Sequence, residues 1–513
     1  MNRLQWAASF MASAKEWVMA PEYQLYWGEL HNHSQLGYGQ GSLERSYDIA
    51  RSHLDFYAFT PHGIHADGGV LEGYPVVREN WDRIIAAARD NNQPGVFSAF
   101  PGYEWHSNQW GHVHVVHKED GGSMQSAPTL ADLQAYYRDQ EVILVPHHTA
   151  YQQGVDWDLF DEKLSPLVEI FSEHGCSERD GGPFPMLGHS GGPGDHTFTL
   201  QHGLALGKRF GFSAGTDNHD GYPGGYGLGL TGVWAQENTR ASLLAAFRAR
   251  RTVAVTGDRI DVEVDVDGAA MGSAVTGARQ LSYRVEGWDR IDQVELLHDN
   301  KRVEQVGPSG GEDNGRYRLR LEWGWGPMKG YQVFDWQGAL KVTGGRLVQA
   351  VPCFASDPFD EHKRKRINQC DDSGCQWQSH TSRGGVLTTR NGTASVRAND
   401  ALCLEVEGEP DTVVELQMDC QTHTSILATA PDWTLSPKLG GLQRSFRLGD
   451  LLAGRWGGRL ENMSSWVVMN RAVAEREFAV AGTFAVAAPG CYYLRVRQEN
   501  GQMAWASPVW VEG

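Results

Sequence analysis

Two histidines separated by a single residue, His31 and His33, follow an apolar and aromatic run near the start of the chain. In a β-strand successive side chains point to opposite faces, so the two imidazoles project the same way if the strand continues through them. Two ligands of one metal ion need this arrangement. The pair therefore predicts a metal site at the end of the first strand.

Further nitrogen and oxygen donors follow in order, each near the end of a predicted strand. They are His62, Glu104, His147, Asp217 and His219. Any one histidine among them is more often an ordinary polar residue than a ligand. The ordered set is different, because zinc, manganese and iron accept imidazole and carboxylate together. The set as a whole favours metal binding.

Short apolar runs alternate with helical patterns through the first half and would position these donors. Predicted strands cover residues 23–30, 54–60, 95–101, 142–145, 167–171 and 209–214, and predicted helices cover 43–53, 81–90, 130–138 and 240–250. Such alternation indicates βα units in a barrel or a doubly wound sheet. In βα barrels the active site lies at the carboxyl ends of the strands, where most of the donors fall. Sixteen of the 20 histidines lie between His31 and His219, so we expect the first half to be the catalytic half.

The second half has a different sequence texture. Residues 260–266 alternate apolar and polar side chains strictly, and similar short runs recur to the end of the chain, which is typical of half-buried strands. The fold class we expect is α/β plus all-β, and the length predicts two or three domains. The expected parts are a helical extension at 1–22, a metal-binding barrel at 23–257 and a β-sandwich-like region at 258–513, which a second boundary near 350 would divide into two modules.

Composition restricts the class of partner. The formal net charge of -18 argues against a nucleic-acid partner, which selects for a basic surface. The first 20 residues lack the apolar core of a signal peptide, and no run approaches the roughly 20 apolar residues of a membrane span. The seven cysteines are thinly spread, and we expect reduced thiols. We therefore expect a cytoplasmic protein with a small-molecule substrate and no membrane partner; a homo-oligomer stays an open alternative.

The ordered motifs resemble those of the PHP (polymerase and histidinol phosphatase) superfamily. The likeness rests on His31-x-His33, Thr60-Pro61-His62-Gly63, Pro101-Gly102-Tyr103-Glu104, Val145-Pro146-His147-His148 and Gly215-Thr216-Asp217-Asn218-His219. It covers about residues 23–257 and is greatest to a bacterial branch with little functional characterisation, whose β-rich tail the C-terminal part also resembles. The resemblance implies a distorted (β/α)7 barrel with up to three metal ions.

The resemblance also implies a ligand set. His31, His33, Glu104 and Asp217 would hold one metal ion, Glu104 would bridge to a second ion completed by His147 and a histidine of the 111–114 segment, and His62 with His219 would hold a third. We favour His112 in the second site because it follows Gly111 as the family pattern has it; His114, on the same strand face, competes with it.

Two departures from the family pattern affect the third site. Residues 36–40 contain no aspartate or histidine, so the third ion would lack a ligand, and the usual Thr-Asp-His is Thr60-Pro61-His62 here. A carboxylate that could hydrogen-bond to the ligating histidine and orient it is therefore missing. We expect two or three divalent ions of zinc, manganese or iron.

Such a cluster indicates hydrolysis. Metal ions a few ångströms apart can share a hydroxide at neutral pH and polarise the bond to be broken. Asp217 can accept the proton of the attacking water, and His174 or His148 can act as the general acid. If the substrate carries a phosphate, Arg179 is our candidate to bind its oxygens.

The function we expect is a metal-dependent hydrolase. The resemblance favours a phosphoesterase acting on a small phosphorylated metabolite or an organophosphate ester. Few lysines lie at the predicted strand ends, so hydrolysis of amide, lactone or carboxylic ester bonds on the same metal centre stays an alternative. The 18 tryptophans are compatible with a third and weaker hypothesis, a non-catalytic carbohydrate-binding protein.

Overall fold

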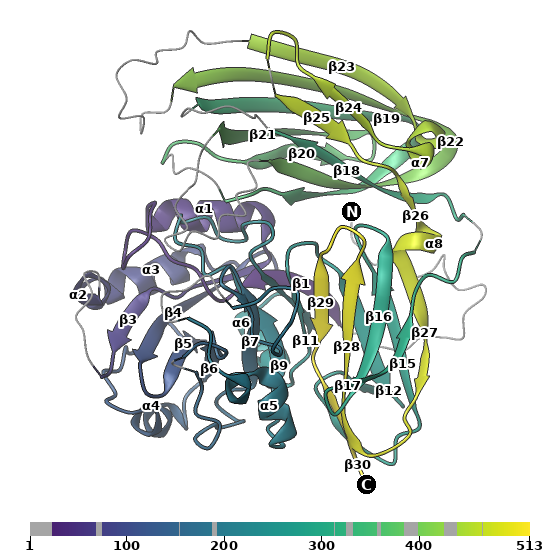
Figure 1. The fold of residues 1–513 in the computed structure, drawn as a ribbon. Helices are drawn as coiled ribbons and strands as arrows, with labels where there is room; N and C mark the ends of the chain where they lie inside the picture. Colours follow the sequence, from purple (N-terminus) through teal and green to yellow (C-terminus); the bar gives the residue numbers. More distant parts are fainter. Residues whose placement is uncertain are drawn as a thin grey trace.

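The computed structural model describes residues 23–67, 74–152, 154–186, 192–311, 313–324, 332–356, 361–383, 399–424, 439–463 and 465–513. The predicted helical extension at 1–22 lies outside these residues. In Figure 1 the N-terminal half, drawn in purple to teal, lies below a large sheet of the C-terminal half, drawn in green and yellow.

The N-terminal half contributes strands to a mixed sheet and to a small separate one. The mixed sheet takes β1 (Gln24–Glu29), β2 (Phe56–Phe59), β3 (His62–His65), β4 (Ser98–Ser107), β5 (Gly111–His117), β6 (Val142–His147), β10 (Leu230–Ala235) and β11 (Thr252–Val255). The three-stranded sheet consists of β7 (Leu167–Ser172), β8 (Gly175–Cys176) and β9 (Gly211–Ala214).

Helices connect and cover these strands. They are α1 (Leu43–His53), α2 (Tyr74–Glu79), α3 (Trp81–Asn91), α4 (Leu130–Tyr137), α5 (Leu200–Ala205) and α6 (Arg240–Arg248), with a 3₁₀ turn at His196–Phe198. Hydroxyl side chains start several of them: Ser42 caps α1, Thr129 caps α4 and Thr239 caps α6, each accepting a backbone N–H of the first turn, as N-cap residues do. Phe247 of α6 then packs on Phe56 and Phe100 beneath the sheet.

The strand order differs from a simple barrel. The hydrogen-bonded path runs β11–β10–β1–β2–β4–β5–β6, parallel from β1 to β4 and antiparallel from β4 to β6. The parallel pair β7–β9 forms its own sheet. Within the described ranges these two sheets do not join into a closed barrel, so the (β/α)7 barrel stays a prediction.

The β-rich character of the C-terminal half is as predicted, but the β-sandwich prediction for 258–513 is wrong. Several of its strands extend the N-terminal sheet: β14 (Ala274–Thr276), β16 (Ile291–His298), β17 (Lys301–Val306), β28 (Gly490–Gln498), β29 (Met503–Ala506) and β30 (Val509–Glu512). The connection is made where β11 pairs with β29. Period-two patterning tells which face of a strand is buried, but it does not tell which strand lies beside it.

The remaining C-terminal strands form two further sheets. A four-stranded sheet contains β12 (Asp261–Val266), β13 (Ala269–Ala270), β15 (Gln280–Glu286) and β27 (Ala479–Ala485). Its buried valines share one apolar core with Trp27 and Val253 of the N-terminal half and with Val294 and Val496. The core therefore crosses the predicted boundary at residue 257, and that boundary stays a prediction.

The upper sheet in Figure 1 has nine strands and its own core. It contains β18 (Arg316–Trp323), β19 (Gln332–Cys353), β20 (Arg366–Asp371), β21 (Gly374–Arg383), β22 (Asp400–Thr424), β23 (Leu439–Arg447), β24 (Trp456–Arg459), β25 (Trp466–Met469) and β26 (Val473–Ala474), with the short helices α7 (Leu448–Ala453) and α8 (Glu475–Phe478) alongside. Its two longest strands, β19 and β22, pair along most of their length.

Among the described residues, no helix combines the length and the apolar character that crossing a membrane would require.

Candidate metal centre

The His31–His33 pair meets the Asp217–His219 pair because two loops run side by side. The loop after β1 and the loop after β9 form a parallel bridge between Asn32 and Asn218. The Asp217 N–H donates to the carbonyl of His31 at 3.0 Å, and the His33 N–H donates to the carbonyl of Asn218 at 3.1 Å. Two segments separated by 186 residues therefore present their side chains to one space.

Asp217 lies at the centre of four imidazoles. Its Oδ1 is 3.0 Å from His31 Nε2 and 2.9 Å from His33 Nε2. Its Oδ2 is 2.8 Å from His148 Nε2 and 2.6 Å from His174 Nε2. Burial raises the pKa of Asp217, but the positive charge of His31 and His174 and the hydrogen bond with His148 outweigh it and hold the pKa well below its usual value. The carboxylate is therefore ionised.

Backbone strain accompanies this contact. Asp217 and His148 adopt φ angles of 54° and 50°, in the left-handed region that side chains other than glycine avoid. Such a conformation costs on the order of 1 to 3 kcal/mol, and it persists where the surrounding structure imposes it. Two strained residues in direct contact point to a local geometry that serves a function.

A second carboxylate, Glu104, lies at the centre of another set of imidazoles. Its Oε1 is 2.5 Å from both His147 Nε2 and His106 Nε2, and its Oε2 is 3.2 Å from His62 Nδ1. Its pKa is raised by burial and lowered more strongly by His106, His62 and His147, and it lies well below the usual value. Glu104 is 1% exposed, so this charge is held almost out of water.

The register of β4, β5 and β6 creates this set. Glu104 lies opposite His114, His106 lies opposite His112, and His112 lies opposite His147. Directly opposite residues of an antiparallel pair share a face and approach closely. Three adjacent strands therefore deliver one carboxylate and several imidazoles to a single patch.

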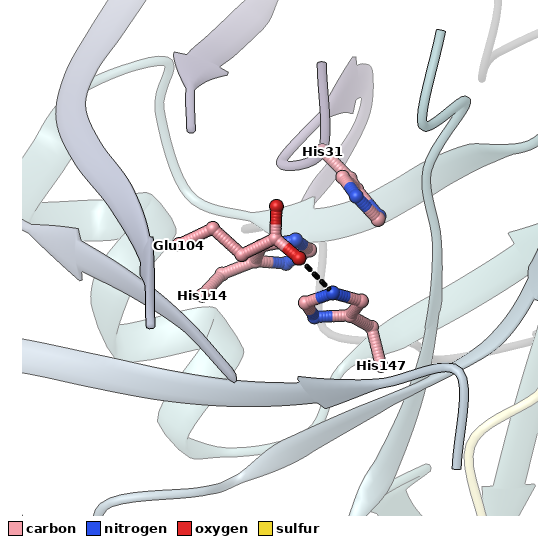
Figure 2. Close-up of side chains that lie close together, drawn as sticks. All are labelled: His31, Glu104, His114 and His147. Atoms are coloured by element: carbon pink, nitrogen blue, oxygen red, sulfur yellow. Dashed lines mark hydrogen bonds and ion pairs between the residues drawn. The ribbon is translucent and has the colours of Figure 1, made fainter. Parts of the chain in front are cut away.

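Figure 2 shows one buried group of these side chains, His31, Glu104, His114 and His147, which converge on one point. One donor atom from each lies within 4.8 Å of the others. The ring of His114 stacks on that of His147 at 3.9 Å between centroids and meets His31 at 3.9 Å. Both nitrogens of His114 are buried without a hydrogen bond to any described residue, which a buried imidazole avoids unless it has another ligand.

Of the two competing histidines, His112 is the more exposed. Its Nδ1 lies 3.8 Å from Glu104 Oε1, and it belongs to a group with Glu104, His106 and His147. His114 belongs to the group in Figure 2. The structure thus brings both predicted candidates to Glu104, and our preference for His112 stays a prediction.

His62 and His219 lie together at the outer edge of the cluster. Their Nε2 atoms are 3.2 Å apart, and each ring stacks on His33. The side chain of His219 is 30% exposed, which is the largest exposure among the predicted ligands. The predicted third site therefore faces the approach from solvent.

The donor set fits a divalent cation. Burial lowers the pKa of His147 to about 4, and burial, reinforced by the neighbouring imidazoles of His147 and His31, lowers that of His114 well below the usual value. Both rings are therefore neutral and offer lone pairs, whereas Glu104 and Asp217 are ionised. Neutral imidazole and carboxylate are the forms in which these side chains bind zinc, manganese or iron.

Two residues at the centre were not predicted from the sequence. His106 is one; it lies two residues after Glu104 on β4 and so shares its face, a signal that the sequence contained. Glu169 is the other; its Oε2 is 2.9 Å from His31 Nδ1, and burial raises its pKa to about 7. A carboxylate in this position fixes the orientation of a ligating imidazole. The sequence signal that could have identified Glu169 is a charged residue inside an otherwise apolar predicted strand.

The structure does not place Arg179 in these groups. Its Nη1 donates to the neighbouring carbonyl of Asp180 at 3.1 Å. The predicted phosphate contact of Arg179 stays a prediction. The two predicted general acids, His148 and His174, instead share one oxygen atom of Asp217, and this contact raises the pKa of His174 to about 9 against the opposing effect of burial.

The upper sheet holds the loop that carries Asp217 and His219. The side-chain amide of Asn218 donates to Ser356 Oγ at 2.8 Å, and Ser356 Oγ donates to Asp220 Oδ2 at 2.8 Å. The Tyr226 N–H donates to the carbonyl of Phe354 at 2.9 Å. Residues 353–356 thus join the end of β19 to the loop that carries Asp217 and His219.

Comparison with known proteins gives partial matches. A model of the DUF3604 family, described as a protein of unknown function, matches residues 53–136 and 208–276. Uncharacterized proteins of Chlamydia muridarum and Chlamydia trachomatis are each 28% identical over 315 residues, covering 56% of this chain and 49% of the relative. One from Chlamydia pneumoniae is 27% identical over 306 residues, covering 54% and 48%. The chain spans about half the length of the curated relatives it matches.

Among solved structures, the chain is similar to a two-domain protein from Bacteroides vulgatus that contains a predicted PHP-like metal-dependent phosphoesterase. The TM-score is 0.33 at 12% identity, covering 58% of this chain and 88% of that chain. A TM-score this low does not establish a shared fold.

Proposed function

We propose that the protein is a metal-dependent hydrolase whose centre lies between Glu104 and Asp217. One observation carries the proposal: two buried, ionised carboxylates are each surrounded by imidazoles, and His114 has no hydrogen bond to any described residue for either ring nitrogen. An enclosed cluster of this kind is costly unless a cation completes it.

The residues divide into holding groups. His31, His33 and Asp217 would hold one ion, and Glu104 and His147 with His114 or His112 would hold another. His33, His62 and His219 form a third group at the exposed edge. When bound, divalent ions would supply Lewis-acid chemistry, which makes water more acidic and polarises the bond to be cleaved.

The remaining side chains handle protons and orientation. Asp217 Oδ2 is the position that can accept the proton of an attacking water, and it lies within reach of both His148 and His174. His174 is the less buried of the two and is our general acid for the leaving group, because a group that protonates a substrate must be reachable. Glu169 keeps His31 oriented.

For the substrate class we favour a small phosphoester, and the support is the resemblance of five ordered motifs to the PHP superfamily. Amide, lactone or carboxylic ester hydrolysis is the second candidate. One observation favours this second candidate: Arg179, the predicted phosphate ligand, donates instead to a backbone carbonyl of its own loop. The carbohydrate-binding hypothesis has no comparable support.

The test combines elemental analysis of the purified full chain with activity on p-nitrophenyl phosphate mono- and diesters and on p-nitrophenyl acetate. Each assay is run before chelation, after chelation and after readdition of zinc, manganese or iron. Asp217→Asn is the test variant, and Asp292→Asn, which alters an exposed carboxylate paired with Arg497, is the matched control.

More than one tightly held ion per chain, with phosphoester turnover that chelation abolishes and Asp217→Asn removes, is the expected result. Turnover of the acetate alone would replace the phosphoesterase by the second candidate. A chain that holds no metal and whose activity and stability are unchanged by chelation would contradict the proposal.

A further inference from the structure

Two cysteine sulfurs lie close together in the C-terminal half of the chain, whereas the histidine cluster lies in the N-terminal half. Cys353 at the end of β19 and Cys403 in β22 have their Sγ atoms 3.4 Å apart. They are 3% and 1% exposed. Cys353 pairs with Ala401, and Cys403 pairs with Val351, so the two cysteines lie diagonally on one face of the sheet. The sulfurs are in contact but are not bonded.

A guanidinium group faces both sulfurs. Arg320 Nη1 lies 3.4 Å from Cys403 Sγ and 3.9 Å from Cys353 Sγ. A cation beside a thiol favours the thiolate, which is the nucleophilic form. Burial raises the pKa of Cys353, but its hydrogen bond with Cys403 and the charge of Arg320 together lower it more, so that the net shift is downward. Cys353 is therefore our candidate nucleophile of the pair.

The neighbouring groups hold Arg320 in place. Its Nη1 is 3.1 Å from Asp258 Oδ1, and its guanidinium carbon lies 4.6 Å from the centre of the Tyr226 ring. Tyr226 itself donates to Asp258 Oδ1 at 2.8 Å. Asp258 opposes the thiolate electrostatically, yet it also orients the guanidinium toward the sulfurs. The arrangement is a fixed cation in contact with two thiols.

A cavity lies beside this guanidinium. Its volume is about 560 Å³, and its lining includes Arg320, Tyr226, Trp288 and Ala401. Ala401 is the direct strand partner of Cys353. Arg320, which contacts both sulfurs, therefore also lines the cavity. Because the two cysteines are only 3% and 1% exposed, a reactant for them must be small, as a hydroperoxide is.

We propose that Cys353 and Cys403 form an oxidisable dithiol site whose reactant is a hydroperoxide. The Cys353 thiolate attacks one peroxide oxygen; an S–O bond forms, the O–O bond breaks, and the leaving alkoxide or hydroxide takes a proton. The Cys403 sulfur then attacks the sulfenic acid; an S–S bond forms and the S–O bond breaks. The Cys403 proton leaves with the hydroxide as water. The peroxide is reduced by two electrons and the thiols are oxidised by two.

The diagonal placement makes this bond readily reversible. Diagonal neighbours in an antiparallel pair have Cα atoms about 7 to 8 Å apart, whereas disulfides span about 4.4 to 6.8 Å. Closing the bond must therefore draw β19 and β22 together locally. A bond formed under that restraint is more easily reduced by thiols than a relaxed structural disulfide. This inference does not depend on the metal centre or on the proposed hydrolase.

The test uses the full reduced chain exposed to hydrogen peroxide, followed by unfolding, alkylation and peptide mass spectrometry. A cross-linked Cys353–Cys403 peptide that dithiothreitol reverses is the expected product. Cys403→Ser should instead accumulate sulfenic acid on Cys353, which dimedone traps, and Cys353→Ser should give no adduct on Cys403. Exposed Cys370 serves as the internal control thiol.

The contribution of Arg320 is tested by rate. Arg320→Gln should slow cross-linking by about tenfold, the change in thiolate population that accompanies one pKa unit. Arg346→Gln, which removes a partly exposed guanidinium paired with Glu407 on the same pair of strands, should leave the rate unchanged. Wild-type protein in which peroxide oxidises Cys370 while Cys353 and Cys403 both remain alkylatable would overturn the proposal. An Arg320→Gln rate equal to that of the wild type would overturn the role given to the guanidinium.

Discussion

The histidine cluster and the nine-stranded sheet both bury charge, but they balance it differently. In the sheet, Arg316 and Arg318 both reach Glu405, and they also contact Glu286. Each guanidinium there meets carboxylates that it can neutralise. In the cluster, Glu104 and Asp217 meet imidazoles, several of which are neutral. The first set is complete within the chain, whereas for the second we propose a cation from outside it.

Buried charge is therefore not in itself a sign of a binding site. Structural networks also shift pKa values and also exclude water. The sign that separates the two regions is the state of the nitrogen atoms. Arginine nitrogens are donors and satisfy carboxylates, whereas neutral imidazoles bring lone pairs that a carboxylate cannot satisfy.

The largest expected effect comes from removing a carboxylate of the cluster. Glu104→Gln should lower metal affinity by more than about 100-fold, because replacing a residue that only orients a ligand already costs about 10- to 100-fold. Glu169→Gln should fall in that lower range. Metal content after dialysis against a graded chelator, measured by elemental analysis, checks both values.

Glu415→Gln is the control for this pair, since it alters an exposed glutamate of the nine-stranded sheet. Equal metal retention in Glu104→Gln and Glu415→Gln would remove the distinction between the two regions.

Removing a carboxylate of the sheet should instead affect stability alone. Glu405→Gln leaves buried Arg318 and half-buried Arg316 short of a partner and should lower the free energy of unfolding by about 3 kcal/mol, with metal content unchanged. Chemical denaturation measures the loss. Glu407→Gln breaks an ion pair whose side chains are 41% and 27% exposed, and it should cost less than about 1 kcal/mol. A comparable loss in both variants would show that burial of the pair is irrelevant.

A buried histidine away from the cluster should make stability depend on pH. Burial lowers the pKa of His117 to about 4. Between pH 6.5 and 4 the unfolded chain binds a proton that the folded chain does not, so stability falls as the pH falls, by up to about 3 kcal/mol for this group. His117→Phe should flatten that part of the curve. The measurement is the free energy of unfolding of both proteins at about pH 4.5 and at about pH 7. Parallel pH dependences of the two proteins would contradict the prediction.

The smallest expected effect is at a contact between α1 of the N-terminal half and a loop of the C-terminal half. Ser42 caps α1 by accepting the N–H of Arg45, and it also donates to Glu361. Ser42→Ala should lower the free energy of unfolding by about 1 kcal/mol. Ser52→Ala, on the same helix but at its other end, should change it by less than about 0.5 kcal/mol. Thermal denaturation of the two variants side by side resolves the difference.

The sequence was informative about individual strands and less so about their neighbours. The predicted strand 23–30 corresponds to β1, and the predicted strand 167–171 corresponds to β7. The predicted strand 95–101, whose continuation was expected to carry Glu104, corresponds to β4, which begins at Ser98 and continues to Ser107. The pairing of β11 with β29 was out of reach, because residues 250 positions apart carry no local signal of contact.

The same limit applies to the candidate site. The predicted donors could be found because residue types and order are written in the sequence. Which of them share an ion depends on register, and the opposition of Glu104 to His114 and of His112 to His147 follows from antiparallel pairing that the alternation of elements did not predict. The ligand set stays a prediction for that reason, whereas the convergence of its members is observed.

The pairing of β11 with β29 also has a consequence for the time course of synthesis. β11 leaves the ribosome roughly 250 residues before its neighbour β29, an interval of roughly 12 to 50 seconds at the usual 5 to 20 residues per second. During that interval the edge of β11 has no strand to pair with, and an open edge invites pairing with other chains. The mixed sheet can therefore be completed only after β29 has been synthesised, and not when the N-terminal half is finished.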